Sequence, residues 1–171
     1  MTTLHPALHS CAVLLALFLA VQARGQAPAS PLEIKSVAEV QSRVTDPKSA
    51  PGGHGGTELI PADRVVPGDR VIYTLEVRNS GATALDAPDF TYPVPEHMRY
   101  VADSAVGPGA EVSFSVDGGH SFARAENLKV KGPDGKLRPA VAADYTDIRW
   151  QLRNSLKPNS VAFVRFRTLV K

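Results

Sequence analysis

The chain has 171 residues, and its 19 lysine and arginine residues nearly balance 17 aspartate and glutamate residues, for a formal net charge of +2. This length favours one domain with a short extension. The charges are interspersed rather than gathered in the basic stripe that phosphate backbones require, so the sequence predicts no nucleic-acid partner.

Residues 1–23 have the pattern of a secretory signal peptide. Residues 11–21, CAVLLALFLAV, form an apolar run that is shorter than the roughly 20 residues of a membrane-spanning helix. Val21-x-Ala23 fits the small-residue pattern before a cleavage site, although the first ten residues contain no lysine or arginine. We therefore expect residues 1–23 to be removed, no stable transmembrane anchor, and a periplasmic, extracellular or cell-surface location.

The single cysteine, Cys11, lies in this leader. It opens the apolar run, whereas the acylated cysteine of a lipoprotein closes such a run, so we interpret it as an ordinary signal residue. The mature chain would then have no disulfide, no thiolate nucleophile and no cysteine metal site. Its stability must come from the core alone.

Residues 24–59 are predicted to form an N-terminal arm. Within it, residues 32–36 alternate apolar and polar side chains and predict one strand, which completes the sandwich that follows. Residues 37–44 fit either a continued strand or a short helix. Residues 46–57, DPKSAPGGHGGT, contain two prolines and four glycines and predict a linker.

Residues 60–171 predict an all-β fold, an antiparallel β-sandwich. Several short segments alternate apolar and polar residues between Gly, Pro and Asn turns, and none has a sustained helical period. Three prolines between residues 85 and 101 place any strand there at a sheet edge. A propeller is excluded, because each blade takes about 40 residues. The expected core comprises Tyr73, Leu75, Val77, Phe114, Trp150, Val164 and Phe166.

Residues 66–81, VPGDRVIYTLEVRNSG, resemble the opening strand and turn of the bacterial "conserved repeat domain", also called domain of unknown function 11. Ile148-Arg-Trp150 and Leu156-Lys-Pro158 resemble its closing pair, and the similarity covers roughly residues 32–170. The resemblance implies an immunoglobulin-like fold in a secreted, periplasmic or surface protein. It brings no catalytic residues.

Ser115-x-Asp117-x-Gly119-x-x-Phe122 resembles the Asp-box of sialidases and related propeller proteins. We interpret it as a structural turn, in which Asp117 accepts hydrogen bonds from following amides while Gly118 and Gly119 supply positive φ angles. A single copy outside a propeller predicts no catalysis.

Other candidate sites are weaker. His54 and Glu58 on the glycine-rich linker are two potential metal ligands where a site needs three or four. Trp150 could stack on a sugar, but its apolar neighbours in alternation favour the core. Four carboxylates at strand ends could serve a glycosidase, yet the sequence does not pair them: Glu111, Asp117, Asp144 and Asp147. The sequence thus predicts no catalytic residue, cofactor or metal.

These patterns predict a non-catalytic, exported immunoglobulin-like module with a structural, adhesive or protein-interaction role and a partner in the envelope or on the surface. Two alternatives stay open. One is an assembly subunit that self-associates by donating its N-terminal arm to a neighbouring sheet. The other is a carbohydrate-binding module.

Overall fold

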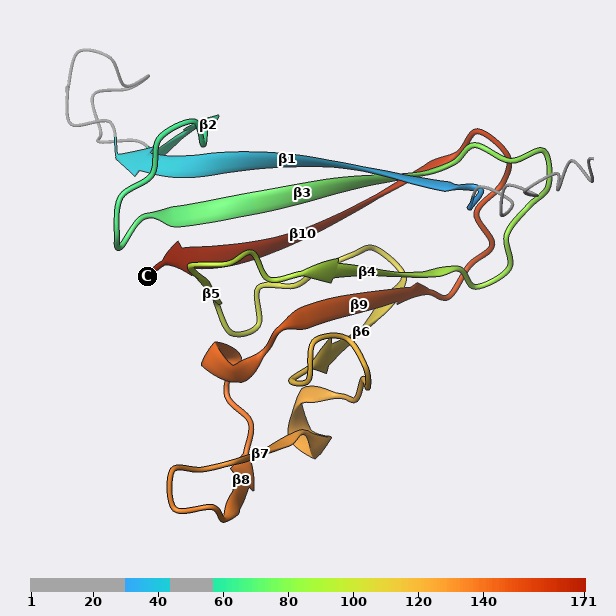
Figure 1. The fold of residues 1–171 in the computed structure, drawn as a ribbon. Helices are drawn as coiled ribbons and strands as arrows, with labels where there is room; N and C mark the ends of the chain where they lie inside the picture. The colour runs from blue at the N-terminus through green and yellow to red at the C-terminus, as the bar shows by residue number, and fades with distance from the viewer. Residues whose placement is uncertain (1–29, 44–56) are drawn as a thin grey trace, which may run out of the picture.

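A computed structural model describes residues 30–43 and 57–171 (Figure 1). These residues form an all-β fold with antiparallel sheets, which confirms that part of the prediction. The strands are β1 (Leu32–Arg43), β2 (Thr57–Pro61), β3 (Arg70–Asn79), β4 (Asp89–Pro93), β5 (Met98–Tyr100), β6 (Ala110–Ser115), β7 (Lys129–Lys131), β8 (Leu137–Pro139), β9 (Asp147–Leu152) and β10 (Val161–Val170). Two short 3-10 turns, η1 (Ala125–Asn127) and η2 (Ala142–Asp144), complete the described elements.

Two antiparallel sheets build the body of the molecule. The larger has the order β2-β1-β3-β10-β5, and the smaller has the order β4-β9-β6. Strands β7 and β8 form a separate two-stranded ribbon, which projects away from both sheets in Figure 1. The two main sheets pack through the apolar side chains between them, as in a β-sandwich.

The core forms where the alternating residues of both sheets meet. Trp150 of β9 stacks on Phe90 of β4 with ring centroids 5.7 Å apart. Phe166 of β10 stacks on Tyr73 of β3 at 4.9 Å. The seven residues assigned to the core from the sequence are all buried: Tyr73, Leu75, Val77, Phe114, Trp150, Val164 and Phe166.

The two short strands of the proline-rich stretch are edge strands. β4 pairs only with β9, and β5 pairs only with β10. Pro93 ends β4, and a proline at this position removes no ladder hydrogen bond from the middle of a sheet. The positions of these prolines therefore agree with the topology.

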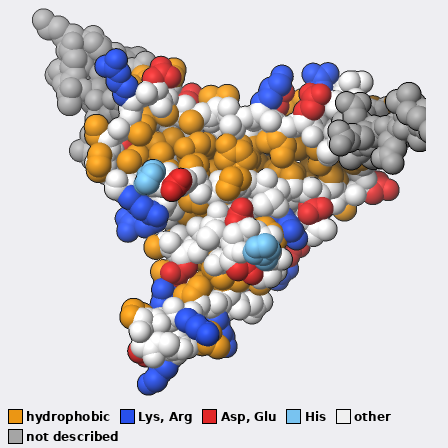
Figure 2. All heavy atoms as spheres, viewed as in Figure 1, with side chains coloured by type: hydrophobic (Ala, Val, Ile, Leu, Met, Phe, Trp, Pro, Cys, Tyr) orange, Lys and Arg blue, Asp and Glu red, His pale blue; other side chains and the backbone are white. Residues whose placement is uncertain are grey.

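The five-stranded sheet extends beyond the three-stranded one. On the side of the sheet formed by β1 and β2, Ile34 of β1 and Ile60 of β2 lie on the inward face, yet both remain about two-fifths exposed (39% and 41%). Figure 2 shows hydrophobic side chains in a continuous band along the long strands of this sheet, with charged side chains gathered at its borders. The molecule thus keeps apolar surface where the second sheet does not cover the first.

The arm forms a longer strand than the residues 32–36 assigned to it from the sequence. The strand expected over residues 32–36 runs to Arg43, because its pairing with β3 continues until Val40 lies opposite Val71 and is buried. β2 crosses the boundary drawn at residue 59 and pairs antiparallel with β1. The arm strand therefore pairs within the larger sheet of its own chain.

Several expectations fall outside the described residues. These are the signal peptide at residues 1–23, most of the linker at 44–56, and His54. Across residues 30–43 and 57–171, the structure has no helix with the length and apolar character needed to cross a bilayer.

Candidate interaction surface

The Asp-box-like turn is a closed network of hydrogen bonds. The buried Ser115 hydroxyl donates to Asp117 Oδ1 at 2.6 Å and accepts from the amide of Gly119 at 2.9 Å. The Ser121 amide donates to Asp117 Oδ1 at 2.9 Å, and the Ser121 hydroxyl donates to Oδ2 at 2.5 Å. Gly118 and Gly119 have φ angles of +72° and +83°. The hydrogen bond from Ser115, followed by those from Ser121, holds the pKa of Asp117 well below its usual range.

The same turn is anchored to the sheet beneath it. The Gly118 amide donates to Thr146 Oγ1 at 3.0 Å, and the Arg149 guanidinium lies 3.8 Å from the centre of the Phe122 ring. The chain returns to β6 through a single bridge between Phe114 and Ala123. Because its polar groups bind one another and the sheet, the turn has the geometry of a structural element.

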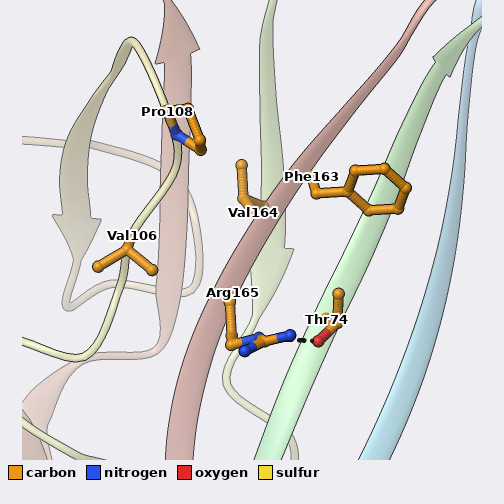
Figure 3. Close-up of a pocket in the computed structure, with 6 residues that line it drawn as sticks. All are labelled: Thr74, Val106, Pro108, Phe163, Val164 and Arg165. Carbon is orange, nitrogen blue, oxygen red and sulfur yellow. Dashed lines mark hydrogen bonds between the residues drawn. The ribbon is translucent and has the colours of Figure 1, made fainter.

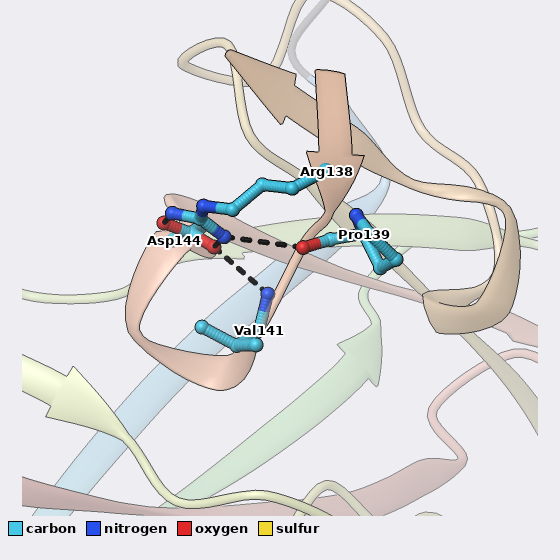
Figure 4. A network of polar contacts seen from close by, with 4 residues as sticks. All are labelled: Arg138, Pro139, Val141 and Asp144. Carbon is cyan, nitrogen blue, oxygen red and sulfur yellow. Dashed lines mark hydrogen bonds and ion pairs between the residues drawn. The ribbon is translucent and has the colours of Figure 1, made fainter. Parts of the chain in front are cut away.

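Two of the remaining candidate carboxylates, Asp144 and Glu111, are held in separate ion pairs. Asp144 accepts two hydrogen bonds from the Arg138 guanidinium, at 2.7 and 2.8 Å, and one from the Val141 amide at 2.8 Å (Figure 4). The Arg138 guanidinium lowers the pKa of Asp144. Glu111 on β6 pairs with Arg124, which likewise lowers its pKa. Asp144 and Glu111 therefore each have a separate arginine partner.

No shared acidic or metal-ligating cluster forms in the described part of the chain. Groups of three or more His, Cys, Asp or Glu side chains in metal-binding proximity are absent from residues 30–43 and 57–171. Asp147 lies beside Gly119 at the base of the turn. Trp150 is fully buried between Phe90 and Phe166, so its indole face is not accessible to a sugar.

A cavity opens instead on the outer face of the five-stranded sheet (Figure 3). Phe163 of β10 points outward and is 56% exposed, and Val106 beside it is 55% exposed. Val106 is brought there by a bridge to Arg165, in which each amide donates to the other residue's carbonyl at 2.8 and 2.9 Å. The cavity has a volume of about 220 Å³ and is lined by Thr74, Val106, Pro108, Phe163, Val164 and Arg165.

Arg165 supplies the charge at this cavity. Its Nε donates to Thr74 Oγ1 at 3.0 Å, and within the described residues it forms no ion pair with a carboxylate. On the same face, Arg167 follows two positions along β10, and Arg99 lies on the neighbouring strand β5. The acidic residues of this face belong to β1 and β3: Glu33, Glu39 and Glu76. Glu76 lies directly opposite Phe163, whereas Arg167 and Arg99 lie on the other side of Arg165 along β10 and β5.

No pattern in the sequence predicted this cavity. The available signal was Phe163, an aromatic side chain at an outward position of an alternating strand. Val106 and Pro108 could not have been assigned to the same site, because they come from an irregular segment about 60 residues earlier in the chain.

Comparisons with known proteins identify no relative that would assign a role to the cavity at Phe163. Searches against protein-family models, curated proteins and solved structures each returned no match. The resemblance to the conserved repeat domain therefore stays a prediction that depends on the residues of this chain.

Proposed function

We propose that this protein is an exported, non-catalytic immunoglobulin-like module that binds another protein of the cell envelope or surface. The observation that carries the proposal is the exposed apolar cavity at Phe163, which lies beside an arginine without an ion-pair partner among the described residues. Apolar side chains that remain exposed beside polar groups are typical of protein-interaction sites. Burying them under a partner removes apolar area from water and is favourable.

Two further features support the proposal. The two packed antiparallel sheets with a buried tryptophan between them are compatible with an immunoglobulin-like sandwich. The apolar run and small-residue motif within residues 11–23 support export. If export occurs as proposed, mass spectrometry of the protein recovered from its native cells finds an N-terminus at Arg24. An N-terminus at Met1 or Thr2 contradicts it.

Site-specific crosslinking tests the interaction itself. A photo-crosslinking amino acid is placed at Phe163 in the full chain, and the matched control carries it at Leu137, an apolar residue of β8 that is 67% exposed. We expect a discrete crosslinked product in native cells from position 163 and not from position 137. Equal labelling at both positions, or no product from either, contradicts the proposed interface.

Assembly by strand exchange is a second candidate, favoured by the weak burial of β1. Of its apolar side chains, Ile34 and Val37 are exposed by 39% and 57%, and only Val40 is buried. The structure pairs β1 with β2 and β3 of its own chain. Because β1 buries little apolar area, removing it from its own sheet during exchange between copies would lose little hydrophobic stabilisation.

A further inference from the structure

We infer that the cavity beside β10 binds an extended, acidic peptide segment of the partner protein, with an aliphatic side chain in the cavity and a carboxylate on Arg165. This inference rests on the proposed function and narrows it to one chemistry of partner. It also places the contact on the outer face of the larger sheet, at residues that the Asp-box-like turn does not include (Figure 3).

The walls of the cavity select an apolar side chain. Val106, Pro108 and Phe163 contribute only hydrocarbon and aromatic surface, and side-chain hydrogen-bonding groups are confined to Thr74 and Arg165. A sugar placed here would leave most of its hydroxyl groups facing hydrocarbon, which is unfavourable without compensating hydrogen bonds. An aliphatic side chain gains from the same surroundings. The lining therefore favours a peptide over a carbohydrate.

The charges select an acidic segment. The Thr74 hydroxyl engages Nε of Arg165, and no other hydrogen bond from Arg165 to a described side chain accompanies it, so the two terminal nitrogens remain available. Guanidinium groups bind carboxylates through paired, charge-assisted hydrogen bonds. Arg167 and Arg99 extend the positive potential along β10 and β5. These three arginines would repel a basic segment, and Glu76, opposite Phe163, is the acidic side chain beside the cavity.

The spacing selects an extended conformation. Phe163 and Arg165 are two residues apart on one face of a strand, which separates them by about 7 Å along β10. An extended peptide presents its own side chains on one face at the same interval. A segment with an aliphatic residue and a carboxylate two positions apart can therefore meet the cavity and Arg165 together.

Two capped synthetic peptides test this inference: Ac-Ser-Leu-Thr-Glu-Ser-NH2 and the same sequence with Lys in place of Glu. Each is titrated into the purified exported protein, labelled with nitrogen-15, and amide shifts are followed by NMR. We expect the Glu peptide to shift the amides of Thr74, Val106 and Arg165 and to bind at least tenfold more tightly than the Lys peptide. Equal binding of the two peptides, or shifts confined to other strands, overturns the inference.

Matched variants separate a specific contact from general electrostatics. Arg165→Glu is expected to weaken the Glu peptide at least tenfold, and Phe163→Ser is expected to weaken it as well. Arg78→Glu makes the same charge change on the same sheet face, on β3, and is expected to stay within twofold of the unaltered protein. All three side chains lie at the surface, and a thermal melt confirms that each variant is folded. Equal weakening by Arg165→Glu and Arg78→Glu overturns the inference.

The two levels of the proposal fail in distinguishable ways. If position 163 crosslinks in cells but neither the Glu peptide nor Arg165→Glu behaves as expected, the proposed interface stands and its acidic partner chemistry is wrong. If position 163 also fails to crosslink, the proposed function fails with it.

Discussion

Gly107 lies where the irregular segment after β5 passes over the core, and replacing it with alanine perturbs packing alone. A Cβ atom at this position would be 2.7 Å from Val164 Cγ1, 3.2 Å from Ala110 Cβ and 3.3 Å from Trp150 Cδ1. Gly107 is not among the glycines with positive φ, so an alanine meets no backbone strain there. Any loss of stability must therefore come from steric overlap between the added Cβ atom and its neighbours.

The magnitude follows from these distances. Carbon atoms attract most strongly at about 3.5–4.0 Å, so the contact with Val164 is too close by roughly 0.8 Å. The three neighbours belong to β10, β6 and β9, and a shift that relieves one contact is opposed by the others. Overpacking of this kind costs about 1–3 kcal/mol. We expect Gly107→Ala to lower the free energy of unfolding by about 2 kcal/mol.

Urea denaturation followed by the fluorescence of Trp150, the single tryptophan of the chain, measures this loss. A double-mutant cycle with Val164→Ala assigns the cause, because removing Cγ1 relieves the closest contact. Gly107→Ala should then cost at least about 1 kcal/mol less than it does in the unaltered protein. A loss below about 0.5 kcal/mol, or an equal loss in both backgrounds, refutes the overlap.

Gly135→Ala is the matched control for this cycle. Gly135 has a φ of +77°, and a Cβ there would meet no atom within 4 Å. Its substitution strains the backbone without filling space, so the loss of stability should not depend on Val164. Coupling between Gly135 and Val164 would show that the cycle reports a global effect and not the contact at Gly107.

Three further predictions concern the turn, a buried amide and the first strand. Asp117→Asn should lower the melting temperature at neutral pH. Because folding depresses the Asp117 pKa, the difference from the unaltered protein should shrink as the pH falls below the ordinary aspartate pKa of about 3.9 toward the lower pKa of the folded state. A difference in melting temperature that does not depend on pH contradicts this. Asn79 is fully buried, and its side-chain amide donates to the carbonyls of Thr83 and Leu156, both at 2.8 Å. Asn79→Ala should therefore lower the free energy of unfolding, measured by urea denaturation, by about 2–4 kcal/mol, and a loss below about 1 kcal/mol contradicts this. In a variant with Val37→Cys and Thr74→Cys, which replace residues paired across β1 and β3, a disulfide should form within one chain, so the protein should run as a monomer in non-reducing electrophoresis. A ladder of disulfide-linked chains would instead support strand exchange.

Local chemistry predicted the strands that make the core. In residues 71–77 and 148–152 the apolar side chains recur at every second position, and each of these segments buries that face in the structure. The prolines around β4 also placed it at an edge, since a proline cannot donate to a second neighbour. Both signals depend only on a residue and its neighbours in the chain, so they can be read without the fold.

The N-terminal arm is a segment whose full structure the local sequence pattern did not predict. The sequence of residues 37–44 fits a strand or a helix. Pairing with β3 on one side and β2 on the other makes residues 37–43 part of a continuous strand. The outward cavity depends equally on distant segments. Phe163 and Arg165 could be placed on the surface from the alternation of β10, but Val106 and Pro108 reach them through a bridge between residues far apart in sequence.

The sequence by itself therefore determined which residues alternate between core and solvent, because alternation is a property of the extended backbone. The tertiary structure decided which strands are neighbours and which outward side chains share a surface. The physical reason is that register and strand order arise from contacts between distant segments, whose summed burial and hydrogen bonding outweigh the preferences of any short stretch.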